Sequence, residues 1–380
     1  MSRKYYFSSE SVTDGHPDKC CDQIADAILD EALSRNKHAK MAVEATIKDD
    51  IVIVYGEQNL YANLNIDHLP EGFDPTIDFA SIAKKVLHDI GYTNEFKVFV
   101  LVGSQSKDIF SKVVLGNEVA AGDQGIMFGY ACKDTPNYMP LAIDTAHKLS
   151  KRLSDFKRED DRIKPDGKTQ VTVLYEDDKP VKITKVVVST QHDASLKLPE
   201  LQKLIRQEVI DKTIDPKWID PSDFEAIINP GGDFIIGGPY GDSGTTGRKI
   251  VVDTYGGSGR IGGGCFSSKD PSKVDRSAAY YCRYVAKNIV ANGLADRCEV
   301  QVSYAIGMKD PLSVYINTFN TEKKPVEEIA QIVDRNFNFT VGNIIKELDL
   351  LRPIYRKTSN FGHFGREEQE FTWEKIIHLK

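Results

Sequence analysis

The chain has 380 residues, of which 41% are hydrophobic and 28% charged, and its formal net charge is −7. The length predicts two or three domains, and the acidic balance excludes the basic stripe of a dedicated nucleic-acid binder. No apolar run approaches the ~20 residues that span a bilayer, and the N-terminal residues lack the apolar core of a signal peptide. We therefore expect a cytoplasmic protein whose six cysteines stay reduced, without a disulfide framework or a zinc site.

Hydrophobic spacing predicts the same run of elements three times along the chain. Pro17 suits the first position of a helix, and Gly91 suits the stop of another. The predicted order is helix 17–36, strands 41–48 and 51–58, helix 76–90 and strand 97–103, then helix 139–153, strands 169–175 and 183–190 and helix 198–209, and finally helix 271–292, strands 298–304 and 313–317 and helix 326–336.

The recurrence has a period of about 127 residues, a third of the chain. It predicts an α+β fold made of three similar units of order α-β-β-α. Each unit is expected to have a small antiparallel sheet with its helices on one face. The expected boundaries are 1–103, 117–235 and 236–380.

Glycine-rich segments at 122–129, 229–249 and 255–270 separate these units. Glycine lets the backbone approach a ligand closely, and the interleaved lysines and arginines favour a ligand site over simple turns. Residues 257–262 match a dinucleotide-binding pattern and follow a predicted strand at 249–254. A Rossmann site is nevertheless disfavoured, because the next helix does not begin until Pro271. A phosphate-binding P-loop motif is absent.

Two equivalent helix starts carry a lysine in the first turn: His16-Pro17-Asp18-Lys19 and Asp270-Pro271-Ser272-Lys273. A cation there opposes the helix macrodipole, so both lysines are predicted to act on something other than helix stability. Two helix N-termini with two lysines would make a phosphate cradle. Simple capping remains the alternative for either aspartate.

Cations and carboxylates gather in the same glycine-rich segments. The set consists of Lys168, Asp242, Arg248, Lys249, Lys269, Lys273 and Asp275. Several cations beside a few carboxylates suggest a binding site for a polyphosphate bridged by Mg²⁺, because Mg²⁺ takes few protein carboxylates. Glu44 and Glu57 lie inside strand patterns. On a buried face each would need a metal ion or a ligand ammonium as partner, whereas on the surface each would need none. Both placements stay open.

Four segments together resemble the S-adenosylmethionine synthetase family. They are SESVTDGHPDK at 9–19, GDQGIMFGYA at 122–131, GGPYGDSGTTGRK at 237–249 and GGGCFSSKD at 262–270. They lie in family order over nearly the whole chain.

The resemblance implies synthesis of S-adenosylmethionine from ATP and L-methionine, followed by hydrolysis of tripolyphosphate to pyrophosphate and phosphate. It implies three similar domains about a pseudo-threefold axis. It also implies a homodimer with active sites at the subunit interface, which can pair as a tetramer. The expected cofactors are two Mg²⁺ per site and K⁺, and no nucleic acid or membrane partner is expected.

Site residues follow by position from the same resemblance. The expected catalytic residues are His16, Lys168, Arg248 and Lys269. The ATP site is expected to be lined by His16, Asp123, Asp166, Lys168, Asp233, Phe234, Asp242, Arg248, Lys249, Cys265 and Lys269. Methionine is expected to contact Glu57, Gln105, Asp242 and Lys273. Asp18 and Asp275 are expected to bind Mg²⁺, and Glu44 to bind K⁺.

The chain departs from the family pattern at several places. Cys265, Ser268, Ile261 and Asp233 stand where the family usually has Ala, Gly, His and Arg. The stretch 110–119 is also shorter and different, and the resemblance implies that it corresponds to a mobile active-site loop. We expect residues 107–120 to act as a lid. Two other functions remain open: a different Mg²⁺–ATP phosphotransferase, which would need a base beside an acceptor hydroxyl, and a nucleotide-binding regulatory module without catalysis.

Overall fold

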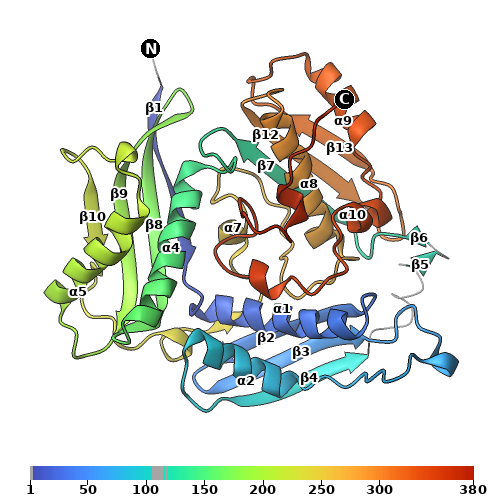
Figure 1. Cartoon of the computed structure of the whole chain (residues 1–380), viewed down its shortest axis with the longest axis horizontal. Helices are drawn as coiled ribbons and strands as arrows, with labels where there is room; N and C mark the ends of the chain where they lie inside the picture. Colours follow the sequence, from blue (N-terminus) through green and yellow to red (C-terminus); the bar gives the residue numbers. More distant parts are fainter. Residues whose placement is uncertain (1–2, 105–113, 116–117) are drawn as a thin grey trace.

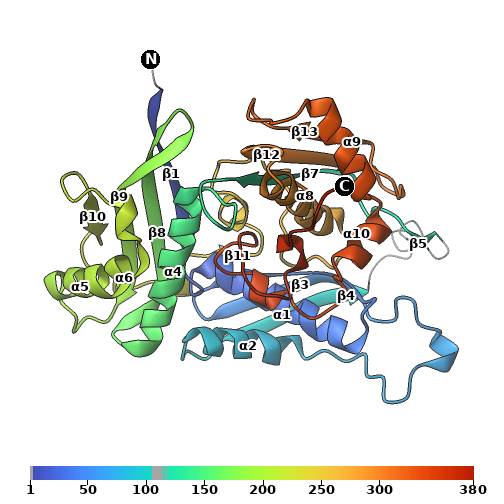
Figure 2. The same ribbon diagram turned by 45° about the horizontal axis from the view of Figure 1, so that its top comes forward.

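A computed structural model describes residues 3–104, 114–115 and 118–380. Three sheets surround the middle of the molecule, and each carries a long helix on the side that faces this middle (Figures 1 and 2). The α+β class with three similar units is therefore confirmed. Within the described residues, no helix is long and apolar enough to cross a membrane.

The first sheet has the order β11-β2-β3-β4. Its strands are Gly244–Thr245 (β11), Lys40–Lys48 (β2), Ile51–Asn59 (β3) and Lys97–Ser104 (β4). The helices α1 (Pro17–Arg35) and α2 (Phe79–Ile90) pack side by side against it.

The second sheet has the order β1-β8-β9-β10. Its strands are Lys4–Val12 (β1), Ile163–Glu176 (β8), Lys179–His192 (β9) and Glu225–Ile228 (β10). It is covered by α4 (Leu141–Glu159) and by α5 (Leu198–Ile205), which continues through a π-helical turn, Arg206–Ile210, into α6 (Asp211–Thr213).

The third sheet has the order β13-β12-β7. Its strands are Ser313–Asn317 (β13), Arg297–Tyr304 (β12) and Gly125–Cys132 (β7). Its helices are α8 (Val274–Ala291), α9 (Val326–Asn336) and α10 (Val341–Glu347). Two short strands, β5 (Val114–Leu115) and β6 (Glu118–Val119), pair antiparallel.

The predicted helices and strands are confirmed except at 249–254, and most ends shift by four residues or fewer. Helix α4 ends six residues later than predicted, and β8 begins six residues earlier. The segment 249–254 is not a strand: it contains a short helix, α7 (Ile250–Asp253), in which the Asp253 amide donates to the Lys249 carbonyl. Its run of β-branched residues suggested a strand, but the Asp253 carboxylate pairs with Lys19 on α1 and holds the segment against that helix. Helix α8 begins at Val274 rather than Pro271.

The sheets are not purely antiparallel as expected. β3 pairs with β4 in parallel, and β9 pairs with β10 in parallel. The reason is the connection: α2 lies between β3 and β4, and α5 and α6 lie between β9 and β10, and a crossover of this kind joins parallel strands. The sheets also exchange strands across the expected unit boundaries, because β1 joins the central sheet and β7 joins the C-terminal sheet.

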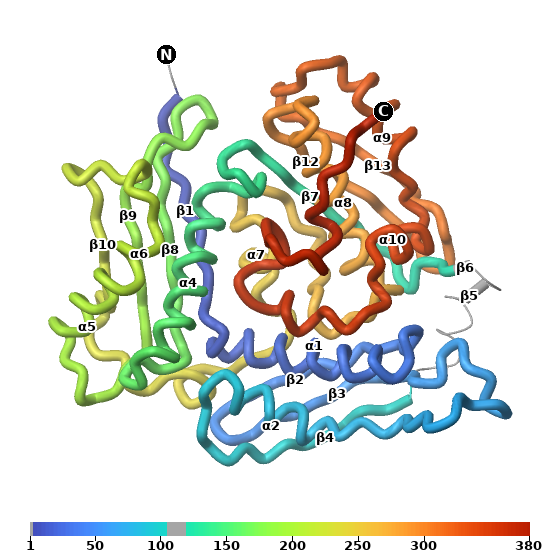
Figure 3. The backbone as a smooth tube through the Cα atoms, in the orientation of Figure 1, coloured from blue at the N-terminus to red at the C-terminus, as the bar shows by residue number. Residues whose placement is uncertain are grey.

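Two hydrophobic cores result. One lies under the central sheet, and the other runs continuously from α1 and β2 to α8, β12 and the C-terminal segment. That segment passes between α1 and α8 (Figure 3). Trp373 stacks on Tyr280 of α8 with 4.1 Å between ring centroids, while the Tyr355 and Arg356 amides donate to Asp30 on α1. The C-terminal segment thus joins the first and third units.

Candidate active site

The first half of the site lies at the N-terminus of α1, where His16 is the N-cap and Pro17 the first helical residue. His16 Nδ1 accepts a hydrogen bond from the Asp18 amide at 3.2 Å, so the proton of the neutral ring lies on Nε2. Burial, and after it the nearby Lys249 ammonium, lower the pKa of His16 to about 3. His16 is therefore a neutral hydrogen-bond donor, not one of the cations.

Asp18 is only 2% exposed and lies at the meeting point of this half. Its carboxylate accepts from Lys249 Nζ at 2.5 Å and from the Thr245 amide at 2.9 Å, and Arg248 Nε lies 3.8 Å away. Burial alone would raise the pKa of Asp18, but the bonds from Lys249 and Thr245 outweigh burial and lower it. Loop 242–249 is thereby fixed against the start of α1.

Gly244 makes this approach possible. A Cβ at this position would lie 2.2 Å from the Pro17 carbonyl oxygen, so only glycine lets β11 lie on the first turn of α1.

Lys168 and Asp242 complete the first half. Lys168 is exposed on β8, and both charges act on the His16 imidazole. Asp166, two residues before Lys168, is 7% exposed, and its carboxylate accepts from the Gly238 amide at 2.9 Å. Burial raises its pKa. Asp166 therefore holds the glycine-rich loop from behind, while the Lys168 side chain is exposed.

The second half lies at the start of α8. Lys269 donates to Asp275, which is in the first turn of that helix. Burial raises the pKa of the Cys265 thiol, on which Lys269, Asp275 and Glu44 also act. Glu44 is half-buried on β2 and accepts from the Tyr55 hydroxyl at 3.2 Å. Lys269 also bridges to Ala42 of the same strand.

The two halves meet at Gly247 and Cys265. A Cβ on Gly247 would lie 2.6 Å from Cys265 Cβ, so the loop that carries Arg248 and Lys249 packs directly on the segment that carries Lys269. The start of α1, the loop at 242–249 and the segment that carries Lys269 are therefore connected by direct contacts.

The prediction that Lys19 and Lys273 together form a phosphate cradle is wrong for Lys19. Lys19 is 1% exposed and donates to Asp22 at 2.9 Å and to Asp253, so it belongs to a buried ion cluster behind the site. Lys273 is partly exposed and pairs with the buried Asp270. Only the second lysine is placed to meet a ligand.

Other expected residues lie apart from these contacts. Glu57 and Asp123 are exposed, and Gln105 lies outside the described residues, as does most of the expected lid at 107–120. Asp233 is exposed beside Phe234 in the loop that follows β10. The Phe234 amide donates to His192 Nε2 at 3.1 Å. Sequence reasoning missed His192, although a histidine at the end of a strand beside a glycine-rich loop was visible.

The carboxylates of Asp18 and Asp275 suit a hard cation that is bound by few protein ligands. Among the described residues, no group of three or more His, Cys, Asp and Glu side chains could hold a metal ion. Asp18 and Asp275 each stand as a single oxygen donor beside lysines and Arg248. This donor set suits Mg²⁺, which keeps waters and takes one or two carboxylates together with substrate phosphates.

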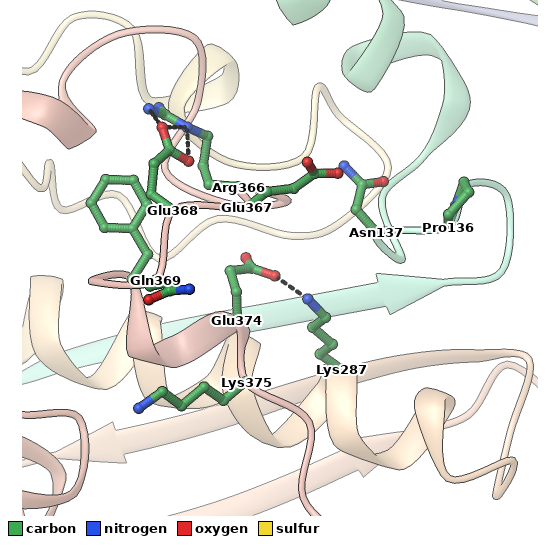
Figure 4. A pocket seen from close by; sticks show the side chains of 10 residues that line it. Pro136, Asn137, Lys287, Arg366, Glu367, Glu368, Gln369, Glu374 and Lys375 are labelled. Atoms are coloured by element: carbon green, nitrogen blue, oxygen red, sulfur yellow. Dashed lines mark hydrogen bonds and ion pairs between the residues drawn. The ribbon is translucent and has the colours of Figure 1, made fainter.

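A separate hollow of about 490 Å³ lies in the C-terminal unit (Figure 4). Its buried carboxylate, Glu374, accepts from Lys287 Nζ at 2.7 Å and from Arg283, and Arg366 pairs with Glu368. Its main charges neutralise one another and tie the C-terminal segment to α8, so this hollow has a structural explanation.

Comparison with known proteins agrees with this geometry. Three family models match successive parts of the chain: the N-terminal domain of S-adenosylmethionine synthetase at 4–107, its central domain at 118–234 and its C-terminal domain at 236–375. An S-adenosylmethionine synthase of Myxococcus xanthus (strain DK1622) is 48% identical over 391 residues, covering 100% of this chain and 95% of the relative. One of Sorangium cellulosum (strain So ce56) is 47% identical over 387 residues, covering 98% and 88%. The chain therefore belongs to the S-adenosylmethionine synthetase family, whose enzymes are methionine adenosyltransferases.

Proposed function

We propose that this protein makes S-adenosylmethionine by attack of the methionine sulfur on C5′ of ATP, and then hydrolyses the tripolyphosphate to pyrophosphate and phosphate. The observation that carries the proposal is the start of α1. There a neutral histidine, a buried aspartate and the cations Lys168, Arg248 and Lys249 gather, as binding a polyphosphate leaving group requires.

The chemistry needs no general base, because a thioether sulfur carries no proton to remove. The C5′–O bond breaks as the S–C5′ bond forms, and the electron pair of the broken bond leaves with the tripolyphosphate. The barrier falls when sulfur, C5′ and the leaving oxygen are aligned and when the charge growing on that oxygen is stabilised. His16 Nε2–H would donate to that oxygen, and the cations would hold the remaining charge.

Asp18 and Asp275 would each hold a Mg²⁺ ion, and Glu44 would hold K⁺. When bound, these ions would neutralise phosphate charge that the protein cations alone do not balance. Lys269, which pairs with Asp275 in the structure, would then be released to bind phosphate.

The outer face of the first sheet supports a homodimer. Glu44, Tyr55 and Leu101 lie side by side across β2, β3 and β4, on the face opposite α1. Leu101 is 68% exposed and Phe99, two residues earlier, is 54% exposed. An apolar face of this kind marks a protein contact. We propose that a second copy covers it and places its Glu57 and Asp123 against the cations of the first, with tetramers as pairs of dimers.

The test is mass spectrometry of the purified protein with ATP, methionine, Mg²⁺ and K⁺. We expect S-adenosylmethionine and phosphate release that depends on methionine. Phosphate transfer to an acceptor hydroxyl would favour the phosphotransferase instead, and nucleotide binding without turnover would favour the regulatory module.

A mixing experiment tests the shared site. Glu57→Gln and Lys168→Met are each expected to lack activity, and exchange of subunits between them should restore activity in hybrid dimers that keep one intact site. A fully active monomer at micromolar concentration would contradict the shared site.

A further inference from the structure

We infer that Asp22 and Asp26 of α1 are positioning residues that set which length of polyphosphate the site prefers. Asp22 would place Arg248 and Lys249 at one end of the chain of phosphates, and Asp26 would place Lys269 at the other end. This inference deepens the proposed function and rests on it.

Aspartates recur at every fourth position along most of α1, which lies between the first sheet and the third unit (Figure 1). Side chains four residues apart stand on one face of a helix, about 6 Å apart along its axis. Each of these aspartates accepts a backbone amide of the third unit at 2.8–3.1 Å. The pairs are Asp18 with Thr245, Asp22 with Gly247, Asp26 with Ser268, and Asp30 with Tyr355 and Arg356. The helix therefore holds successive segments of the third unit at a fixed spacing.

Asp22 fixes the loop that carries Arg248 and Lys249. Its side chain is 0% exposed, so it does not itself meet a ligand. Its Oδ1 accepts from the Gly247 amide at 2.8 Å, and its Oδ2 accepts from Lys19 Nζ at 2.9 Å. Gly247 directly precedes Arg248 and has a φ of +80°, a conformation that favours glycine. The Asp22 carboxylate therefore fixes the backbone from which both cations extend.

Asp26 does the same for the segment that carries Lys269. It is also 0% exposed, and two hydrogen bonds from the Arg276 guanidinium, at 2.7 and 2.8 Å, hold its carboxylate in place. The carboxylate also accepts from the Ser267 hydroxyl at 2.9 Å and from the Ser268 amide at 3.1 Å. Ser268 directly precedes Lys269 and has a φ of +81°, which residues with a side chain rarely adopt. The bonds to Asp26 stabilise this turn and thereby set the direction in which Lys269 extends.

One helix therefore anchors both loops through aspartates that are four residues apart. Lys249 and Lys269 are partly exposed, so their ammonium groups are accessible to phosphate oxygens. Neither loop can move relative to the other without breaking a buried bond to α1. We expect a chain of three phosphates to bind the cations of both loops, and pyrophosphate to bind those of one loop.

Asp30 provides the matched control. It belongs to the same row of aspartates and accepts from the Tyr355 and Arg356 amides at 2.8 and 2.9 Å. The segment that it holds carries none of the proposed site residues. Asparagine has one acceptor oxygen in place of two, so Asp30→Asn removes a contact of the same kind without touching the loops of the site.

The experiment measures how tripolyphosphate and pyrophosphate inhibit S-adenosylmethionine formation in Asp22→Asn, Asp26→Asn and Asp30→Asn. The preference for tripolyphosphate is the ratio of the two inhibition constants. We expect it to fall about tenfold in Asp22→Asn and in Asp26→Asn, because a displaced loop loses a charge-assisted hydrogen bond to the longer chain. In Asp30→Asn it should stay within about twofold, because a distant contact does not couple to the loops. A general loss of stability would lower the active fraction of the enzyme but would not change this ratio.

Asp26→Asn also leaves the buried Arg276 guanidinium without its carboxylate. If this variant does not fold, Ser267→Ala decides, because it removes one bond to Asp26 and keeps the ion pair. The preference should fall about threefold in Ser267→Ala, the value of one ordinary hydrogen bond. Thr358→Val, which removes a hydroxyl that accepts from Arg276, should leave the preference unchanged.

A wild type without a preference for tripolyphosphate, an unchanged preference in Asp22→Asn or Asp26→Asn, or an equal fall in Asp30→Asn overturns the inference while the proposed function stands. If the wild type forms no S-adenosylmethionine, the proposed function fails. Calorimetric titration of the same variants with tripolyphosphate and with pyrophosphate then decides the inference by the ratio of the two dissociation constants.

Discussion

The starts of α1 and α8 are equivalent in the repeat, yet their lysines play opposite parts. Lys19 at the first start is buried and donates to Asp22 and Asp253. Lys273 at the second start is partly exposed, and its partner Asp270 is the buried member of the pair. At the first start the lysine is the enclosed member of its ion cluster, and at the second the aspartate is the enclosed member of its pair.

The difference shows that the repeat preserves the backbone but not the role of each position. The first unit encloses its lysine because α7 places a carboxylate on it from 234 residues away. The third unit has its carboxylate in the preceding turn, where Asp270 also accepts from the Ser272 and Met41 amides. Equivalent positions of the two motifs therefore differ in burial and in the partner that each charge has.

The largest expected effect comes from Lys19→Met. It leaves Asp22 and Asp253 buried without their cation, and breaking a buried pair in this way typically costs about 3–5 kcal/mol. We expect a free energy of unfolding lower by that amount in urea titration. Lys273→Met should lose about 1 kcal/mol or less, because its ammonium is partly exposed. Equal losses of unfolding free energy in Lys19→Met and Lys273→Met would contradict the difference between the two helix starts.

The reverse contrast is expected in kinetics. Lys273→Met should raise the KM for methionine about ten- to hundredfold, the value of a charge-assisted hydrogen bond to a carboxylate. Lys273→Arg, which keeps the charge, should lose less. Steady-state titration with methionine measures both, and a normal KM in Lys273→Met would remove this residue from the site.

The two proposed Mg²⁺ ligands, Asp18 at the first start and Asp275 in the first turn of α8, should behave alike. Asp18→Asn and Asp275→Asn should each raise the Mg²⁺ concentration for half-maximal activity several-fold, because each removes one of the few protein ligands. Circular dichroism should show an unchanged fold. Wild-type Mg²⁺ dependence in both variants would remove them as metal ligands.

The smallest expected effect concerns pH. Because the pKa of His16 is lowered to about 3, the unfolded chain binds a proton that the folded chain does not as the pH falls from about 6.5 toward 3. His16 therefore makes the free energy of unfolding fall with falling pH over that window. In His16→Gln, the slope of the free energy of unfolding against pH over this window should fall by the equivalent of up to one bound proton, as measured by urea titration at several pH values. An unchanged slope would mean that His16 is already protonated in the folded protein.

The fold was predictable where local signals act. Pro17, Gly91 and the hydrophobic periodicity place helices and strands within a few residues of their observed ends. The partners of β1 and β7 were not predictable, because a strand carries no local sign of which distant sheet it joins. The prediction of a strand at 249–254 was wrong for a similar reason: the segment is helical because Asp253 pairs with the distant Lys19, and nothing local indicates that pairing.

The site was predictable in its residue types but not in its layout. The cations and carboxylates were visible among the glycines, and Asp18, Arg248 and Lys249 do gather. Two properties required the structure. One is the neutrality of His16, which follows from its burial and from the nearby Lys249 ammonium. The other is the positioning of the glycine-rich loop by His192 and Asp166 from behind.

The central claim is that the bond from C5′ to oxygen breaks. The direct test uses ATP labelled with ¹⁸O in the oxygen that joins C5′ to the α-phosphate, incubated with the enzyme, methionine, Mg²⁺ and K⁺. We expect S-adenosylmethionine to contain no label and all of the ¹⁸O to appear in pyrophosphate and phosphate. Retention of the label on the adenosine carbon, or phosphate release without S-adenosylmethionine, would contradict this claim.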